Sequence, residues 1–66
     1  MTITLQNQKA RTMANDIVTI SGEFEVQCRM VDKSNQPLGY IIGGYAADGK
    51  WHNFLVALDV VERKEE

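Results

Sequence analysis

The amino-acid sequence predicts a mainly β fold, either a small antiparallel barrel or a strongly curled sheet of four or five strands. Three observations favour it. Residues 23–31 alternate apolar and polar side chains, a period of two that is typical of a half-buried antiparallel strand. Asp48-Gly49 lies between two apolar runs, which is the composition of a type I′ hairpin turn. Glycines interrupt residues 38–47, where they favour sharp bending of a strand.

The N-terminal part of the chain carries two short strand patterns. Residues 1–6 alternate and predict a first strand, whereas residues 7–15 are polar without a clear period and are interpreted as a loop. Alternatively, residues 1–12 form a mobile extension. Residues 17–20 (Ile-Val-Thr-Ile) predict a second strand, and the Ser-Gly at 21–22 allows a bend or a bulge before the next one.

The alternation in residues 23–31 assigns two faces to that strand. Phe24, Val26, Cys28 and Met30 share one face, and charged or amide side chains occupy the other. We predict that the apolar face belongs to the core. On that face a free cysteine behaves as a small buried hydrophobe.

The C-terminal part contains a loop, a strand and an ambiguous segment. Residues 32–38 have loop composition, and residues 38–47 predict a bent strand. Residues 51–62 fit the period of a strand or of a helix, and their β-branched content together with the preceding turn favours a strand. The alternative is an α+β fold in which residues 52–64 form a C-terminal helix. Residues 63–66 are charged and are expected to fray.

The chain has few means of stabilising a small domain other than its core. Residues 1–66 indicate one small β domain, and a chain of this length buries only ~60% of its unfolded surface. Cys28 is the sole cysteine, and with His52 it supplies too few thiol and imidazole ligands for zinc. We therefore predict no disulfide within the chain, no metal and no cofactor. Small domains that lack disulfides and metal sites commonly oligomerise, which predicts a homodimer or a higher homo-oligomer.

The charge balance limits the classes of partner. Seven basic and nine acidic residues leave a formal net charge of −2. That balance argues against a general duplex-DNA binder, because such binding depends on Lys and Arg neutralising phosphates. The apolar runs are shorter than the ~20 residues that span a bilayer, so no membrane partner is predicted. An unpaired cysteine without a visible secretory signal indicates the cytoplasm.

One hairpin and its neighbouring strand hold most of the aromatic and basic side chains. The candidate binding residues are Tyr40, Tyr45, Lys50, Trp51, His52 and Arg29. The leading hypothesis is a protein-binding and self-association surface, because apolar strands of a small domain pair readily with other chains. The alternative is a single-stranded nucleic-acid-binding barrel, in which aromatics stack on bases beside the cations. The simplest expectation for most aromatics in so short a chain is burial in the core.

No arrangement of residues predicts catalysis. Cys28 and His52 have the chemistry of a nucleophile and a base, but no third residue is spaced to orient the histidine. The carboxylates are scattered over turns and strand faces, without the pairing that glycoside hydrolysis needs. We therefore expect a non-catalytic cytosolic interaction module. It is expected to self-associate, to regulate or inhibit a larger protein, or both.

Overall fold

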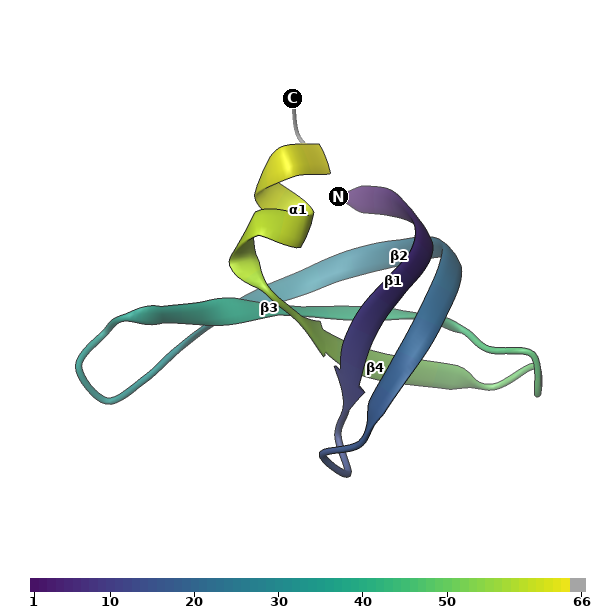
Figure 1. Cartoon of the computed structure of the whole chain (residues 1–66), viewed down its shortest axis with the longest axis horizontal. Helices are drawn as coiled ribbons and strands as arrows, with labels where there is room; N and C mark the ends of the chain where they lie inside the picture. The colour runs from purple at the N-terminus through teal and green to yellow at the C-terminus, as the bar shows by residue number, and fades with distance from the viewer. Residues whose placement is uncertain (65–66) are drawn as a thin grey trace.

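The protein is a four-stranded antiparallel barrel with one C-terminal helix (Figure 1). The computed structural model describes residues 1–64. Its elements are β1 (Thr2–Thr12), β2 (Ile17–Val31), β3 (Pro37–Tyr45), β4 (Trp51–Val56) and α1 (Leu58–Lys64). The strands close into a ring in the order β1-β2-β3-β4, which confirms the mainly β prediction. Within residues 1–64, no helix has the length and apolar character needed to cross a membrane.

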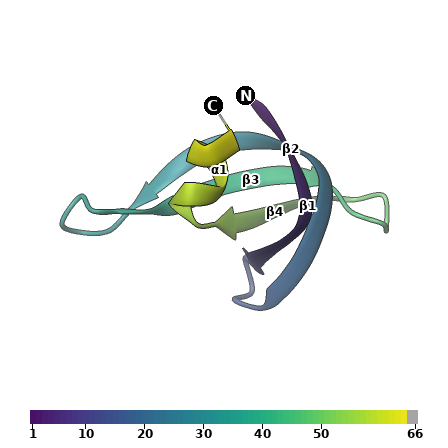
Figure 2. The same cartoon turned by 45° about the horizontal axis from the view of Figure 1, so that its top comes forward.

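The long strand β2 curves around the barrel and pairs with two different neighbours (Figure 2). Its first half pairs with β1 and its second half with β3. The bend lies at Gly22, whose φ of +126° confirms the expected irregularity. Opposite it, β1 contains a bulge, and the backbone N–H of Asn7 donates to Oγ of Ser21 at 2.9 Å.

This bulge explains why the loop prediction for residues 7–15 was wrong over most of its length. The ladder resumes at Gln8 and continues to Arg11, so β1 reaches Thr12. Residues 1–12, which sequence alone also allowed as a mobile extension, therefore contain a full strand. The extra residue of the bulge disrupts the apolar period that would otherwise reveal such a strand.

The core fills the interior of the ring. Phe24 and Phe54 meet edge to face, with ring centroids 5.9 Å apart. Gly44 lies against the Phe24 ring, since a Cβ there would be 2.6 Å from it. The buried apolar residues are Ile3, Leu5, Ala10, Ile20, Phe24, Ile42, Phe54, Val56, Val60 and Val61. All strands and the helix therefore contribute to one core.

The segment from Trp51 onward is divided between a strand and a helix. Phe54 and Val56 point inward at strand spacing, whereas Val60 and Val61 enter the core from α1. Asp59 lies in the first turn of α1, where a carboxylate stabilises the helix dipole. The strand prediction was therefore wrong beyond Val56, and the alternative helix over 52–64 was wrong before residue 58.

The structure tests the predicted fraying of residues 63–66 only in part. Arg63 and Lys64 belong to α1. Arg63 also lies 3.5 Å from Asp59 in an exposed ion pair. Residues 65–66 lie outside the described part of the chain.

A second bulge, at Gln27, reverses the predicted faces of β2. Val26 is the partner of Ile42, but Cys28 is the partner of Ile41, so β2 has one residue more than β3 at this point. The predicted burial of Cys28 was therefore wrong, and its side chain is exposed. Met30 is half-buried and lies on the outside of the sheet.

The β3–β4 turn lies where Asp48-Gly49 indicated, but it is longer than a type I′ turn. The backbone N–H of Gly49 donates to the carbonyl of Ala46, and the N–H of Ala46 donates to the carbonyl of Lys50. Gly49 has φ of +78°, whereas Asp48 is not among the residues with positive φ. A type I′ turn needs positive φ at both central residues, so that detail was wrong.

Candidate interaction surface

The six predicted binding residues do not form one site, and Tyr45 and Trp51 form one exposed pair among them. They are direct cross-strand partners at the start of the hairpin. Their rings meet edge to face with centroids 5.2 Å apart. Tyr45 is 72% exposed and Trp51 is 41% exposed, so the expectation that most aromatics are buried was wrong for this pair.

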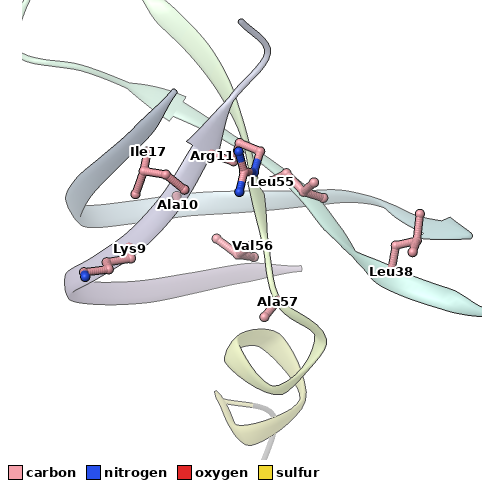
Figure 3. Close-up of a pocket in the computed structure, with 8 residues that line it drawn as sticks. All are labelled: Lys9, Ala10, Arg11, Ile17, Leu38, Leu55, Val56 and Ala57. Carbon is pink, nitrogen blue, oxygen red and sulfur yellow. The ribbon is translucent and has the colours of Figure 1, made fainter. Parts of the chain in front are cut away.

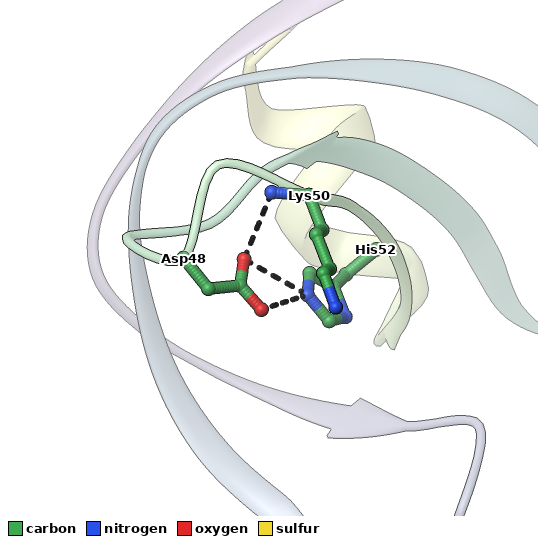
Figure 4. A network of polar contacts seen from close by, with 3 residues as sticks. All are labelled: Asp48, Lys50 and His52. Atoms are coloured by element: carbon green, nitrogen blue, oxygen red, sulfur yellow. Dashed lines mark hydrogen bonds and ion pairs between the residues drawn. The ribbon is translucent and has the colours of Figure 1, made fainter.

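His52 alternates with Trp51 along β4, so it belongs to the opposite side of the strand, whereas Lys50 belongs to the turn before β4. His52 Nε2 lies 3.0 Å from Oδ2 of Asp48 (Figure 4). The same carboxylate accepts the backbone N–H of Lys50 at 2.9 Å. This N–H and then His52 lower the pKa of Asp48. Asp48 thus joins the His52 ring and the backbone of Lys50 in one turn network.

Tyr40 and Arg29 lie toward the other end of β3. They are cross-strand partners, and the half-buried Tyr40 packs against the core. Tyr40 and Tyr45 are five positions apart along β3, a distance of ~17 Å at strand rise. Arg29 therefore lies well away from the exposed aromatic pair.

Strand register places a second set of residues side by side on the outside of the barrel. We call the Tyr45 and Trp51 pair the aromatic row. The next row along the strands, the glycine row, contains Glu25, Gly43 and Asn53. Beyond it, the central row crosses all four strands, β2 twice, and contains Cys28, Ile41, Leu55, Arg11 and Ile17. These three rows together are called the outer face.

Trp51 is fixed on the outer face by its neighbours. A Cβ at Gly43 would be 2.5 Å from Cζ2 of Trp51, so the indole lies directly over a backbone without a side chain. Nε1 of Trp51 donates to Oδ1 of Asn53 at 3.2 Å. Gln27 lies on the same side, since its Nε2 would be 2.7 Å from that Cβ. The indole is therefore held against the sheet before any partner binds.

Two shallow cavities of about 280 and 250 Å³ meet at the central row, where both are lined by Arg11 and Leu55. Figure 3 shows the first cavity. Its other lining residues are Lys9, Ala10, Ile17, Leu38, Val56 and Ala57. Those of the second are Thr12, Met13, Asn15, Met30 and Ile41. Met13 and Ile17 are each 58% exposed and Leu38 is 55% exposed, so the surface here is largely apolar.

Charge is unevenly distributed over this surface. Lys9 and Arg11 are the only charged residues that line the two cavities. The guanidinium of Arg11 donates to neutral oxygens of Asn15, at 2.9 Å to Oδ1 and 3.4 Å to the carbonyl. Glu25 is the charged residue of the glycine row, next to the backbone that Trp51 covers. The outer face is therefore basic at one corner and acidic at another.

Sequence reasoning missed most of the outer face. Leu55 and Ile41 were assigned to strands without a surface role, and Ile17 and Leu38 were treated only as strand ends. The single available signal was that residues 51–56 place apolar side chains on both faces of the strand. A strand with one face in water usually has a polar outer face. The register of the bulged strand β2 decided the rest.

Comparisons of the chain with protein-family models, with curated proteins and with solved structures find no match. Within residues 1–64, no three His, Cys, Asp or Glu side chains are grouped so that they can hold a metal ion. The outer face is therefore interpreted from its own geometry and chemistry.

Proposed function

We propose that the protein is a non-catalytic interaction module that self-associates through the outer face of β3 and β4. The observation that supports this most strongly is the central row, in which apolar side chains of three strand segments lie in register on the outside of a barrel. The aromatic row continues the same surface. Contiguous apolar surface of this kind marks protein interaction sites in small proteins.

The size of the molecule agrees with such an interface. Its extents are 37 × 30 × 17 Å, and the chain exposes 4701 Å². A stable interface buries roughly 800 Å² on each partner, which is a modest part of this surface. Association would also stabilise a small barrel, because binding that requires the folded state shifts the folding equilibrium.

The nucleic-acid alternative receives less support from the same geometry. Base stacking on exposed aromatics depends on cations beside them to neutralise the backbone. Here Arg29 is remote from the aromatic row, whereas Glu25 is the strand partner of Gly43, the residue that the indole covers. A carboxylate at that position repels phosphate. A larger protein that this module regulates or inhibits would bind the same outer face and compete with self-association.

Sedimentation velocity over a range of concentrations tests the proposal. The wild-type chain is expected to sediment as a dimer or a larger assembly that dissociates on dilution. The double variant Ile17→Thr, Leu55→Thr removes apolar groups from the central row, and it should remain monomeric where the wild type is associated. Val31→Thr is the control, because Val31 is an exposed apolar residue of β2 outside the outer face. A folded wild-type monomer at millimolar concentration would contradict the proposal.

A further inference from the structure

The ladder between β1 and β4 is short, and the two strands separate at the first cavity (Figure 3). Within residues 1–64 the two strands are paired over two positions, and the ladder ends at Arg11 and Leu55. The residues that follow this pair on both strands line the cavity of about 280 Å³; they are Ala10 and Lys9 on β1, and Val56 and Ala57 at and after the end of β4. The cavity therefore occupies the place where the ladder would continue, and we call it the strand gap.

The backbone of Lys9 faces the strand gap. The N–H of Thr12 donates to the carbonyl of Asp16 at 2.8 Å, so Thr12 bonds toward the β2 side. Because backbone groups of successive residues in a strand point to opposite sides, Arg11 and Lys9 direct theirs toward β4. Arg11 meets β4 there, whereas β4 has turned away opposite Lys9. The carbonyl of Lys9 accepts the side-chain amide of Gln8 at 3.1 Å, which agrees with its position outside the ladder.

The charged residues that line the strand gap are both cationic. Lys9 and Arg11 lie two positions apart on β1, so their side chains share one side of the strand. Ala10 between them is buried, so this side is the outside of the barrel. The Arg11 guanidinium donates to neutral oxygens of Asn15, and within residues 1–64 neither cation forms a salt bridge. The strand gap is thus positive in a chain whose formal net charge is −2.

The remaining side chains around the strand gap are apolar. Ala10 and Val56 are buried members of the core, and Figure 3 shows Val56 between the two strands. Ile17 and Leu38 are more than half exposed beside them. A partner that places aliphatic side chains here removes this apolar surface from water, which favours binding.

We infer that the strand gap binds an extended segment of a partner protein, which adds a strand to the edge of β1 with an acidic residue opposite Lys9 and an aliphatic residue on each side of it. The N–H and carbonyl of that acidic residue bond the carbonyl and N–H of Lys9 in an antiparallel pair. Its carboxylate lies beside the Lys9 ammonium, because directly opposite residues share a face of the sheet. The two aliphatic side chains point the other way, toward Ala10 and Val56.

This inference rests on the proposed function in one respect, that this part of the outer face binds protein, and it does not require self-association. Ile17 and Leu55 line the strand gap and also belong to the central row, so a bound segment would compete with a second copy of the chain. Residues 24–26 and 58–60 of this chain come close to the required pattern, but they lie in the paired strand β2 and in α1. A different protein therefore supplies the segment.

Titration with a short peptide tests the inference, at protein concentrations below the association range. The probe is acetyl-Ser-Val-Glu-Val-Ser-amide. One control peptide carries Lys in place of Glu, and a second carries a methyl group on the backbone nitrogen of Glu. Both controls should bind the wild type at least about tenfold more weakly than the probe. The first brings like charges together, and the second removes the N–H that bonds the carbonyl of Lys9.

A charge exchange between protein and peptide tests the role of Lys9. Lys9→Glu should lose the Val-Glu-Val peptide and bind the Val-Lys-Val peptide, because the attractive pair is restored with its signs reversed. Lys33→Glu is the matched control, since it makes the same charge change on an exposed residue of the β2–β3 turn. It should keep the preference of the wild type. Equal binding of the two peptides by Lys9→Glu would overturn the inference.

Amide hydrogen exchange locates the bound segment. The N–H of Lys9 faces the strand gap, so saturating Val-Glu-Val peptide should slow its exchange by about tenfold or more, whereas the N–H of Ala10 faces β2 and should change little. Unchanged exchange at Lys9, or no binding at millimolar peptide, would overturn the inference. Self-association of a wild type that binds no peptide would leave the proposed function standing alone. A monomer that binds the peptide at Lys9 would leave this inference standing without self-association.

Discussion

The two faces of the β3–β4 pair are both apolar, but only one of them is covered. On the inner face, Ile42 and Phe54 are cross-strand partners and both are buried. On the outer face, Ile41 and Leu55 are also partners, yet both are only half-buried. A strand pair of an antiparallel sheet normally has one apolar and one polar face. This difference is the main support for the proposal that a partner covers the outer face.

This comparison predicts that substitutions on the two faces have different consequences. Inner-face substitutions should lower the stability of the fold and affect association only through unfolding. Outer-face substitutions should weaken association in a chain that remains folded.

The largest expected effect is that of Phe54→Ala. Phe54 is 8% exposed and packs edge to face on Phe24, so its removal leaves a cavity and should cost about 3–5 kcal/mol of folding free energy. A domain this small has only about 5 kcal/mol or somewhat more to lose. Circular dichroism should therefore show a largely unfolded chain at room temperature. A cooperative melt close to that of wild type would contradict the assignment of Phe54 to the core.

Adjacent glycines provide a sharper version of the comparison. Ala at Gly44 would place Cβ 2.6 Å from the Phe24 ring and 3.0 Å from a backbone carbonyl. This overpacking should cost about 1–3 kcal/mol in chemical denaturation. Ala at Gly43 would instead displace the Trp51 ring, which can swing outward toward solvent. We expect Gly43→Ala to weaken dimerisation and change Trp51 fluorescence, with a smaller loss of stability than Gly44→Ala.

The reverse order of stability would mean that Trp51 is part of the structural core rather than of an interaction surface. It would also show that the glycine row is not free to respond to a partner. Measuring both variants below and above the wild-type association range separates the two effects.

A small and local effect is expected from pH at the hairpin turn. The pKa of Asp48 lies below its ordinary value of 3.8, chiefly because its carboxylate accepts the N–H of Lys50 and then because it contacts His52. Its contribution to the turn is thus fully present above that ordinary value, and it is lost as the pH falls through the lowered one. The amide resonance of Lys50 should report this titration in NMR spectra. Asp48→Asn should remove it and leave dimerisation unchanged.

The smallest expected effect is the change in the NMR spectrum on addition of single-stranded oligonucleotides. Because Arg29 is remote from the aromatic row and the carboxylate Glu25 is paired with Gly43 beneath the indole, a mixed pool of short oligonucleotides should produce no salt-dependent shifts in labelled protein. Shifts at Tyr45 and Trp51 that weaken as salt rises would favour the nucleic-acid alternative, since counterion release produces that dependence.

Sequence alone predicts the fold class of this protein but not its outer face. The alternation up to Val26 and the position of the Asp48-Gly49 turn are local signals, and both appear in the structure. The bulge at Gln27 is not a local signal, because it depends on how β2 pairs with β3. It brings Cys28 and Met30 to the outside of the sheet, whereas an uninterrupted alternation places them in the core.

The C-terminal segment also depends on tertiary packing. Residues after Val56 fit either a strand or a helix by period, and burial of Val60 and Val61 against the barrel decides for the helix. Short apolar segments are ambiguous for this reason, because tertiary packing outweighs local propensity. The position of Trp51 also depends on tertiary structure, because its indole lies on the outer face over Gly43, which has no side chain.

The most direct test of the central claim is an isotope-filtered NOE experiment on a mixture of labelled and unlabelled chains. Self-association through the outer face predicts intermolecular NOEs among the methyl groups of Ile41 and Leu55 and the indole protons of Trp51. Those NOEs should disappear in the double variant Ile17→Thr, Leu55→Thr and persist in the control Val31→Thr. Intermolecular NOEs confined to α1 or to the inner-face strands, or none in a concentrated sample, would contradict the claim that a second copy covers the outer face.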